Sequence, residues 1–384
     1  MKTSISSAIL PMAILSCMSV APCMAQQDTS YIILENTIVL QNISGRLGHM
    51  AYSAKQGTIY LAALSNNTLE VIDLQDKKTI KSIKSLRQPV DVEYLPGSNV
   101  VLVACLGDGL CRAFNASTYK EETSFRFDQN VSLVKYNPSL QTIYIGYGEG
   151  AIALIDANML KYKLSIKLPV HPEAITIDNS SDKMYVSLTK NREIGVIDLK
   201  NNTLGKTLHL PDGAENYPLA FDKINKRLFV GCRKPAKLLV LDAENGKKLA
   251  AIDLDAEVNE LFYDEVRKQI YVTCGDGYLH IVKQDIKEIK QQVEKSAAPG
   301  QTSKTTPKTG SKTKKTTSQT SKKPATNTQP QYRIVKQDTY ATVVRLFTAS
   351  GARTSLYLPE SSQLIVAAPA SGDKDARLLV YRLK

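Results

Sequence analysis

Residues 184–189 (MYVSLT) and 194–199 (IGVIDL) are two apolar segments separated by a short polar turn. The same pair recurs along the chain at intervals of 42, 42, 41, 44, 42 and 94 residues. A period of this length with four short strands per copy is typical of a propeller blade. The sequence therefore predicts an all-β fold, a seven-bladed β-propeller over residues 26–384. The copies are anchored on Tyr60, Leu102, Tyr144, Tyr185, Phe229, Tyr271 and Ile365.

The long last interval indicates an insert. Residues 281–285 (IVKQD) recur unchanged at 334–338, a displacement of 53, and removing 53 residues from the interval of 94 leaves 41. We therefore predict a low-complexity insert at 286–333, between the third and fourth strands of blade six. Residues 291–330 hold eight lysines, one acid and no aromatic residue, a composition that cannot form a core and predicts disorder. A solvated loop and weak, salt-sensitive contact with anionic surfaces both fit it.

The final copy stops at Lys384, directly after its third strand. Residues 35–43, ahead of the first copy, have a strand-like pattern and no other assignment. We predict that this N-terminal segment supplies the missing outer strand of blade seven and closes the ring, which removes an exposed sheet edge.

The positive charge is concentrated in the insert. Of the formal net charge of +12, residues 291–330 contribute +7 and Lys2 a further +1. The rest of the chain is left near +4. The charge therefore does not favour nucleic acid as a partner of the folded part.

The first residues have the layout of a secretory signal. Lys2 precedes an apolar stretch at 5–15 and small residues that lead to Ala25. Cleavage after Ala25 would remove 1–25 and predicts a periplasmic or secreted protein that begins at Gln26. The alternative is a lipoprotein signal at 14–17, which would leave the protein lipid-anchored through Cys17. No later run approaches the roughly 18 apolar residues of a transmembrane segment, so none is predicted.

Four cysteines follow the predicted signal. Cys105 and Cys111 flank a turn and could face each other across a hairpin, as a disulfide or as two free thiols. Cys232 and Cys274 share a repeat position with Cys105, and two other copies have Ala63 and Ala368 there. This pattern predicts a position for a small buried residue and not a metal site.

The repeats resemble those of the YVTN/YncE-like bacterial propellers over essentially the whole chain outside the insert. Four stretches are similar to a mostly uncharacterised exported branch of that group. The resemblance implies the propeller fold and a role in binding or partner recruitment, with lactone hydrolysis or lyase chemistry in distant relatives. The stretches are 46–50 (RLGHM), 62–68 (AALSNNT), 228–236 (LFVGCRKPA) and 351–356 (GARTSL).

The candidate site is the mouth of the axial channel. Loops that precede the inner strands and loops that join second to third strands gather there. Two of the latter, at Asn66–Asn67 and at 233–235, depart from the Gly-acid-Gly turn of other blades, which favours a ligand site. The candidate ligand-binding residues are Arg46, His49, Asn67, His171, Glu173, Asn216, Tyr217, Arg233, Glu260, Arg353 and Thr354.

Among these residues, Arg46, His49, Arg233 and Arg353 are interpreted as donors to an anion. Two other interpretations stay open. The mouth could be an ordinary solvated surface, or His171, Glu173 and Glu260 could act as acid and base or hold a metal.

The predicted function is a binding or scaffold module that takes an anionic small molecule or a protein partner at the mouth. The alternative is a hydrolase or lyase, lactonase-like, that uses the same His and Glu residues. No cofactor is predicted. The chain has no tryptophan, which argues against a quinoprotein dehydrogenase, no Cys-x-x-Cys-His haem site, and no phosphate-binding Gly-rich loop.

The signal assignment is testable by intact-mass spectrometry of the mature protein. We expect a chain that begins at Gln26, because Ala25 ends the small-residue cleavage region. A mature form that begins at a lipid-modified Cys17 would instead establish the lipoprotein alternative.

Overall fold

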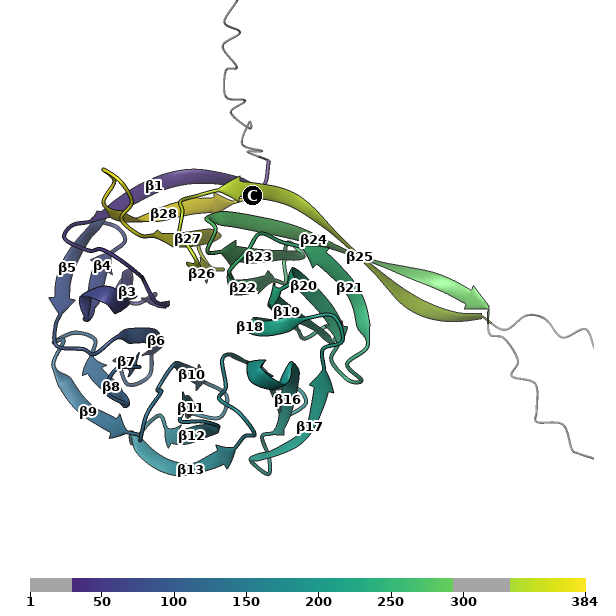
Figure 1. Cartoon of the computed structure of the whole chain (residues 1–384), viewed down its shortest axis with the longest axis horizontal. Helices are drawn as coiled ribbons and strands as arrows, with labels where there is room; N and C mark the ends of the chain where they lie inside the picture. The colour runs from purple at the N-terminus through teal and green to yellow at the C-terminus, as the bar shows by residue number, and fades with distance from the viewer. Residues whose placement is uncertain (1–29, 293–331) are drawn as a thin grey trace, which may run out of the picture.

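The computed structural model describes residues 30–292 and 332–384. Within these residues the strands form seven four-stranded antiparallel sheets, arranged as blades around a central axis (Figure 1). The predicted seven-bladed β-propeller is therefore confirmed. No helix in the described ranges is both long and apolar enough to span a membrane.

In each blade the strands run from the axis to the outside in chain order, except that β1 is the outer strand of blade seven. Blade one comprises β2 (Met50–Ser53), β3 (Thr58–Ala63), β4 (Thr68–Asp73) and β5 (Lys78–Ile83). Blade two comprises β6 (Pro89–Leu95), β7 (Val100–Cys105), β8 (Leu110–Asn115) and β9 (Glu121–Arg126). Blade three comprises β10 (Leu133–Asn137), β11 (Thr142–Tyr147), β12 (Ala151–Asp156) and β13 (Lys161–Lys167).

Blades four and five comprise β14 (Ile175–Asp178), β15 (Lys183–Leu188), β16 (Glu193–Asp198) and β17 (Thr203–His209); and β18 (Ala214–Asp222), β19 (Arg227–Lys234), β20 (Ala236–Asp242) and β21 (Lys248–Asp253). Blades six and seven comprise β22 (Val258–Asp264), β23 (Gln269–Cys274), β24 (Tyr278–Gln292) and β25 (Tyr332–Phe347); and β26 (Thr354–Leu358), β27 (Gln363–Ala368), β28 (Ala376–Leu383) and β1 (Ile32–Leu40). Two short 3-10 turns, η1 (Leu64–Asn66) and η2 (Thr189–Asn191), precede β4 and β16.

The repeated Ile-Asp at the end of the third strand has a structural cause. The Asp73 carboxylate accepts hydrogen bonds from the backbone N–H groups of Gln75 and Asp76, at 2.9 and 2.7 Å. Asp156, Asp198 and Asp242 make the same pair of bonds in their blades. Such Asx turns fix the tight connection to the outer strand, so the aspartate marks where these four blades turn back.

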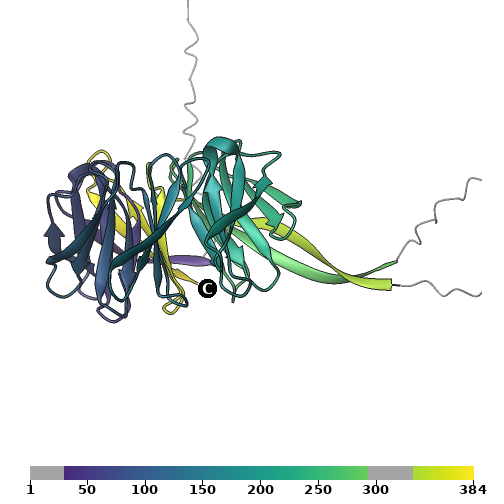
Figure 2. The same ribbon diagram turned by 90° about the horizontal axis from the view of Figure 1, so that it is seen from below.

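Blade six lacks this turn. Lys283 pairs with Gln269, the position that Asp73 takes opposite Thr58 in blade one. Instead of turning, β24 and β25 continue side by side as a two-stranded ribbon that projects beyond the ring (Figures 1 and 2). The predicted insert at 286–333 therefore differs from the structure at both ends, because 286–292 and 332–333 are paired strand. Its remaining residues, 293–331, lie outside the described residues.

The base of the ribbon is fixed to the neighbouring blade. Arg227 of β19 forms a nearly buried ion pair with Asp338 of β25, with a second bond of 3.2 Å from its Nη2. The Asp338 carboxylate also accepts a hydrogen bond from Tyr340, at 3.2 Å. Blade five therefore holds the ribbon where it leaves the ring.

The ring is closed by β1, which pairs antiparallel with β28 from Ile32↔Leu383 to Leu40↔Ala376. The prediction of closure by an N-terminal strand is confirmed, with the strand three residues nearer the N-terminus than the predicted 35–43. The side chains of Ile38 and Leu40 are 1% and 0% exposed and share a core cluster with Ile59 of blade one and Leu378 of blade seven. This strand therefore joins the first and last blades.

Aromatic pairs connect neighbouring blades. In each, a ring on the second strand of one blade lies against a ring on the inner strand of the next, with centroids 5.0–6.1 Å apart. Contacts of this kind add to the apolar area that the blades bury. The pairs are Tyr60–Tyr94, Tyr185–Phe221, Phe229–Tyr263 and Tyr271–Tyr357.

The four cysteines after the predicted signal are free and buried. Cys111 pairs with Ala104 and not with Cys105, so the two thiols point to opposite faces of blade two and lie in different core clusters. This geometry excludes the disulfide alternative. The positions of Cys105, Cys232 and Cys274 are fully buried, as the small-residue pattern predicts.

The closing strand can be tested with Ile38→Ala. Removing three buried methyl or methylene carbons should cost about 2–5 kcal/mol of unfolding free energy, seen as a lower urea midpoint. The matched control is Ile80→Ala, on the outer strand of blade one, where the side chain is 43% exposed. Its loss should lower the unfolding free energy by only about 0.5 kcal/mol. Equal losses in the two variants would show that β1 does not carry the closure.

Candidate binding site in the axial channel

The propeller encloses a central cavity of about 1030 Å³ that receives side chains from the inner strands of all seven blades described. Known ligand sites have volumes of about 300–1,000 Å³. The channel is therefore large enough for a small organic molecule.

Seven of the eleven predicted site residues line this cavity: Arg46, His49, His171, Glu173, Tyr217, Arg233 and Glu260. The other four are placed differently by their local structure. Asn67 has left-handed backbone (φ 57°), accepts a hydrogen bond from the Gln88 N–H at 2.9 Å and lines a separate shallow hollow. Asn216 is fully buried and donates to the Glu193 carbonyl at 3.0 Å, and Thr354 is buried in blade seven. Arg353 lies beside Glu257, at 3.5 Å.

The mouth carries a group of arginines. Arg46 is exposed, and its guanidinium has no hydrogen-bond or ion-pair partner among the described residues. Partial desolvation lowers the pKa of Arg46, and the charges of Arg353 and Arg233 lower it further, while Glu257 and Tyr217 act against this shift. Arg233 is held by the Val258 carbonyl at 2.9 Å and by Asn259 at 2.7 Å, and it stacks on the Tyr217 ring at 3.8 Å. The charges of the predicted arginines therefore interact, although Arg353 does not line the cavity.

His171 and Glu173 lie on the mouth between blades three and four. Both ring nitrogens of His171 are occupied, because Nδ1 donates to the Gly148 carbonyl and Nε2 meets the Ser132 hydroxyl, each at 2.6 Å. Burial raises the pKa of Glu173, while the charges of His171 and Arg233 act against this shift. His171 is thus committed to a structural link between loops.

His49 and Glu260 form the central ion pair of the channel. His49, at the start of blade one, meets Glu260 of blade six at 2.7 Å between Nδ1 and Oε2, past the inner strand of blade seven. Burial alone would lower the pKa of His49, but the charge and the hydrogen bond of Glu260 outweigh it and raise the pKa to about 9. His49 is therefore an imidazolium at neutral pH.

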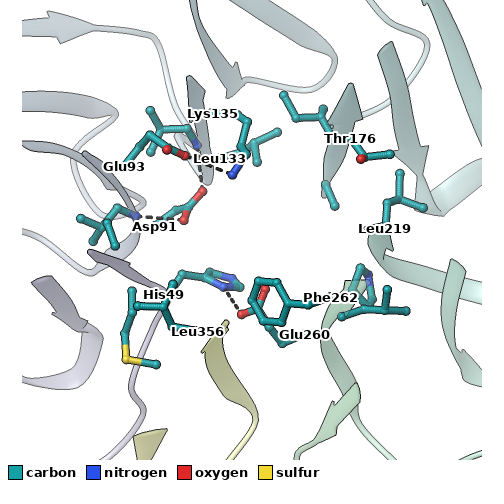
Figure 3. A pocket seen from close by; sticks show the side chains of 18 of the residues that line it. His49, Asp91, Glu93, Leu133, Lys135, Thr176, Leu219, Glu260, Phe262 and Leu356 are labelled. Carbon is teal, nitrogen blue, oxygen red and sulfur yellow. Dashed lines mark hydrogen bonds and ion pairs between the residues drawn. The ribbon is translucent and has the colours of Figure 1, made fainter. Parts of the chain in front are cut away.

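Three charged residues deeper in the channel were not among the predicted site residues. Asp91 accepts hydrogen bonds from the N–H groups of Val92 and Val134, both at 2.9 Å, and Glu93 pairs with Lys135 at 3.3 Å (Figure 3). Burial raises the pKa of Asp91 and of Glu93, and the Glu93 carboxylate raises that of Lys135. The signal that could have identified them is a charged side chain inside an inner strand, where most copies have apolar or small residues.

The described residues do not contain a group of three or more His, Cys, Asp or Glu side chains arranged to hold a metal ion.

Searches for similar proteins agree with this architecture. No family model matches the chain. The protein YncE of Salmonella typhi is 31% identical over 137 residues, which cover 34% of this chain and 38% of that protein. YncE of Escherichia coli K12 is 22% identical over 234 residues, 56% of this chain and 66% of that protein. The matched segments span less than two thirds of these relatives.

The chain is a seven-bladed β-propeller that is similar in sequence to YncE. The names of these YncE relatives assign no ligand or reaction. A chain in the crystal structure of a mitotic checkpoint complex also aligns with the YncE-like propeller, over 98% of this chain and 99% of the other, with a TM-score of 0.65 and 13% identity. That likeness concerns the fold alone.

The central ion pair of this YncE-like propeller can be tested with Glu260→Gln. Without the carboxylate, burial dominates, and the pKa of His49 should fall from about 9 to below its ordinary value of about 6.5. Imidazole signals in NMR titrations measure this directly, and a His49→Gln variant assigns the signal among the four histidines.

The same pair predicts a pH dependence of stability. A raised pKa in the folded state stabilises the protein fully below the unfolded pKa and no longer does so above the folded pKa. The difference in melting temperature between the natural protein and Glu260→Gln should therefore be largest below about pH 6.5 and shrink as the pH rises through about 9. A difference that grows with pH would contradict this assignment.

Proposed function

We propose that this YncE-like propeller is an exported binding or scaffold module whose axial mouth takes an anionic group of a small molecule or of a protein partner. The observation that carries the proposal is Arg46, whose guanidinium lines the cavity without a partner among the described residues. Arg233 and Arg353 lie close enough to disfavour its charge.

A group of like charges stores unfavourable electrostatic energy. The Glu257 carboxylate, which pairs with Arg353 at 3.5 Å, offsets part of this repulsion. An anion at the mouth would convert this repulsion into attraction, and the guanidinium group is suited to carboxylate and phosphate oxygens. The electrostatics of the mouth thus favour an anionic ligand.

The alternative, a hydrolase or lyase, needs a side chain that can accept a proton. His49 is the histidine placed in the channel with a carboxylate, but a pKa of about 9 keeps its ring protonated at neutral pH. His171 is oriented at Nδ1 by the Gly148 carbonyl and not by a carboxylate, and its Nε2 meets the Ser132 hydroxyl. A general base should have a pKa near the working pH, so the geometry supports binding better than catalysis.

Export to the periplasm or the exterior belongs to the proposal on the strength of the signal-like sequence of residues 1–25, which lie outside the described residues. The lysine-rich segment 291–330 is proposed to make weak contact with anionic surfaces, because eight lysines against one acid attract polyanions at low salt.

The mouth can be tested with Arg46→Gln. Titration calorimetry with a hexaglutamate peptide and with citrate should show binding to the natural protein and at least a tenfold loss in the variant, since one charged hydrogen bond is worth about 1.5–3 kcal/mol. The melting temperature of the free variant should be unchanged or slightly higher, because a repulsion is removed.

Arg87→Gln is the matched control. Arg87 is an exposed arginine on the same face that lines the separate hollow beside Asn67, so its loss should leave binding unchanged. Equal affinities in the two variants, or unfolding of Arg46→Gln, would contradict the proposed site.

A further inference from the structure

The channel below the mouth has two unlike walls (Figure 3). One wall carries the Glu93–Lys135 pair and Asp91, with His49 next to Asp91. Across the channel from this wall lie Leu219 and Phe262, from blades five and six. Glu260, the partner of His49, lies beside Phe262, and Leu356 of blade seven lies beside His49. A cavity that is charged on one side and apolar on the other favours a ligand with the same division.

The charged wall presents its cations. The Lys135 side chain is 49% exposed against 20% for Glu93, and His49 is 32% exposed against 16% for Glu260. In both pairs the base is therefore more exposed than the acid. Asp91, the third acid, already accepts two backbone N–H groups.

Both cations retain unused donors. His49 uses Nδ1 for Glu260, and its Nε2 has no partner among the described residues. The ammonium of Lys135 has three N–H groups and, within the described part of the chain, one partner atom, on Glu93. Each residue can therefore donate to a ligand anion without breaking its own ion pair.

The apolar wall would cover the rest of the ligand. Phe262 is half-buried at the channel surface, and Leu219 lines the same side of the channel. Covering such surface stabilises a complex by about 25 cal/mol for each Å² of apolar area removed from water. An inorganic anion would leave this wall wet, whereas an anion with a flat hydrocarbon body would cover it.

We propose that the channel binds a small amphipathic carboxylate, with the carboxylate on Lys135 and His49 and its hydrocarbon body against Leu219 and Phe262. This inference deepens the proposed function and rests on it, because the arginines of the mouth attract the anion that these deeper donors then hold.

The probes are 2-naphthoate, its neutral isostere 2-naphthamide, and acetate, each titrated calorimetrically into the natural full-length protein. Naphthoate should bind at least tenfold more tightly than either of the others, because only naphthoate offers both an anion and an apolar body. Equal binding of naphthoate and naphthamide, or no binding of naphthoate, would overturn the proposal without any variant.

Lys135→Gln should weaken naphthoate binding by about tenfold or more, the loss expected for a hydrogen bond to a charged group. The matched control is Lys163→Gln, since Lys163 pairs with Asp156 at 3.0 Å, is 41% exposed, and lies on an outer strand away from the channel. If Lys135→Gln does not fold, Phe262→Ala tests the other wall, with its melting temperature as the check on folding. Unchanged affinity in the folded variant overturns the proposal.

Failure of this inference is distinguishable from failure of the proposed function. If Arg46→Gln weakens citrate binding while Lys135→Gln leaves naphthoate binding unchanged, the mouth binds anions and the deeper site is wrong. If neither citrate, hexaglutamate nor naphthoate binds the natural protein, both are wrong.

Discussion

The antiparallel pairing of β1 with β28 is the constraint on which the rest of the structure depends. Blade seven has only three strands from the C-terminal part of the chain, and β1 adds the fourth. Because Ile38 and Leu40 also pack against blade one, this pairing joins the two ends of the ring. The axial channel exists only while the ring is closed, and His49 of blade one can reach Glu260 of blade six only across that closed blade seven.

The channel shows how a repeated fold acquires a particular site. Each inner strand contributes the same positions to the axis, and most copies fill them with apolar or small residues. Blades two and three depart from this pattern with Asp91, Glu93 and Lys135. Buried charges are costly unless they are paired, and here each one has a partner or backbone donors. The acids on this side of the channel are therefore held by an ion pair or by backbone donors, and Lys135 is the more exposed partner of its pair.

The blades could be predicted from the sequence because each copy repeats the same local pattern of apolar strands and turns. The aspartate that ends the third strand of blades one, three, four and five also makes the turn, and strand alternation marks the outer strands. Blade six has Lys283 at the position of the turn-forming aspartate, and its strands continue as a ribbon instead of turning. The predicted insert boundaries differed because a duplicated segment, 281–285 and 334–338, does not reveal that strands keep pairing beyond the blade.

The site was predicted less completely. Arg46, His49 and Glu260 could be placed at the mouth from the repeat alignment, but Asn67, Asn216 and Thr354 were not distinguished from channel residues. Their side chains serve turns and the interior, and a loop position does not specify the direction of a side chain. The deeper residues were missed for the same reason, because only the assembled ring shows which inner-strand side chains face the axis.

Anomalous diffraction from crystals soaked in 6-bromo-2-naphthoate tests most directly the central claim that the channel is an amphipathic anion site. The account predicts one dominant bromine peak inside the channel beside Phe262 and Leu219, with carboxylate density within hydrogen-bonding distance of Lys135 and His49. A dominant peak outside the channel, or a carboxylate that points toward the apolar wall, would contradict it.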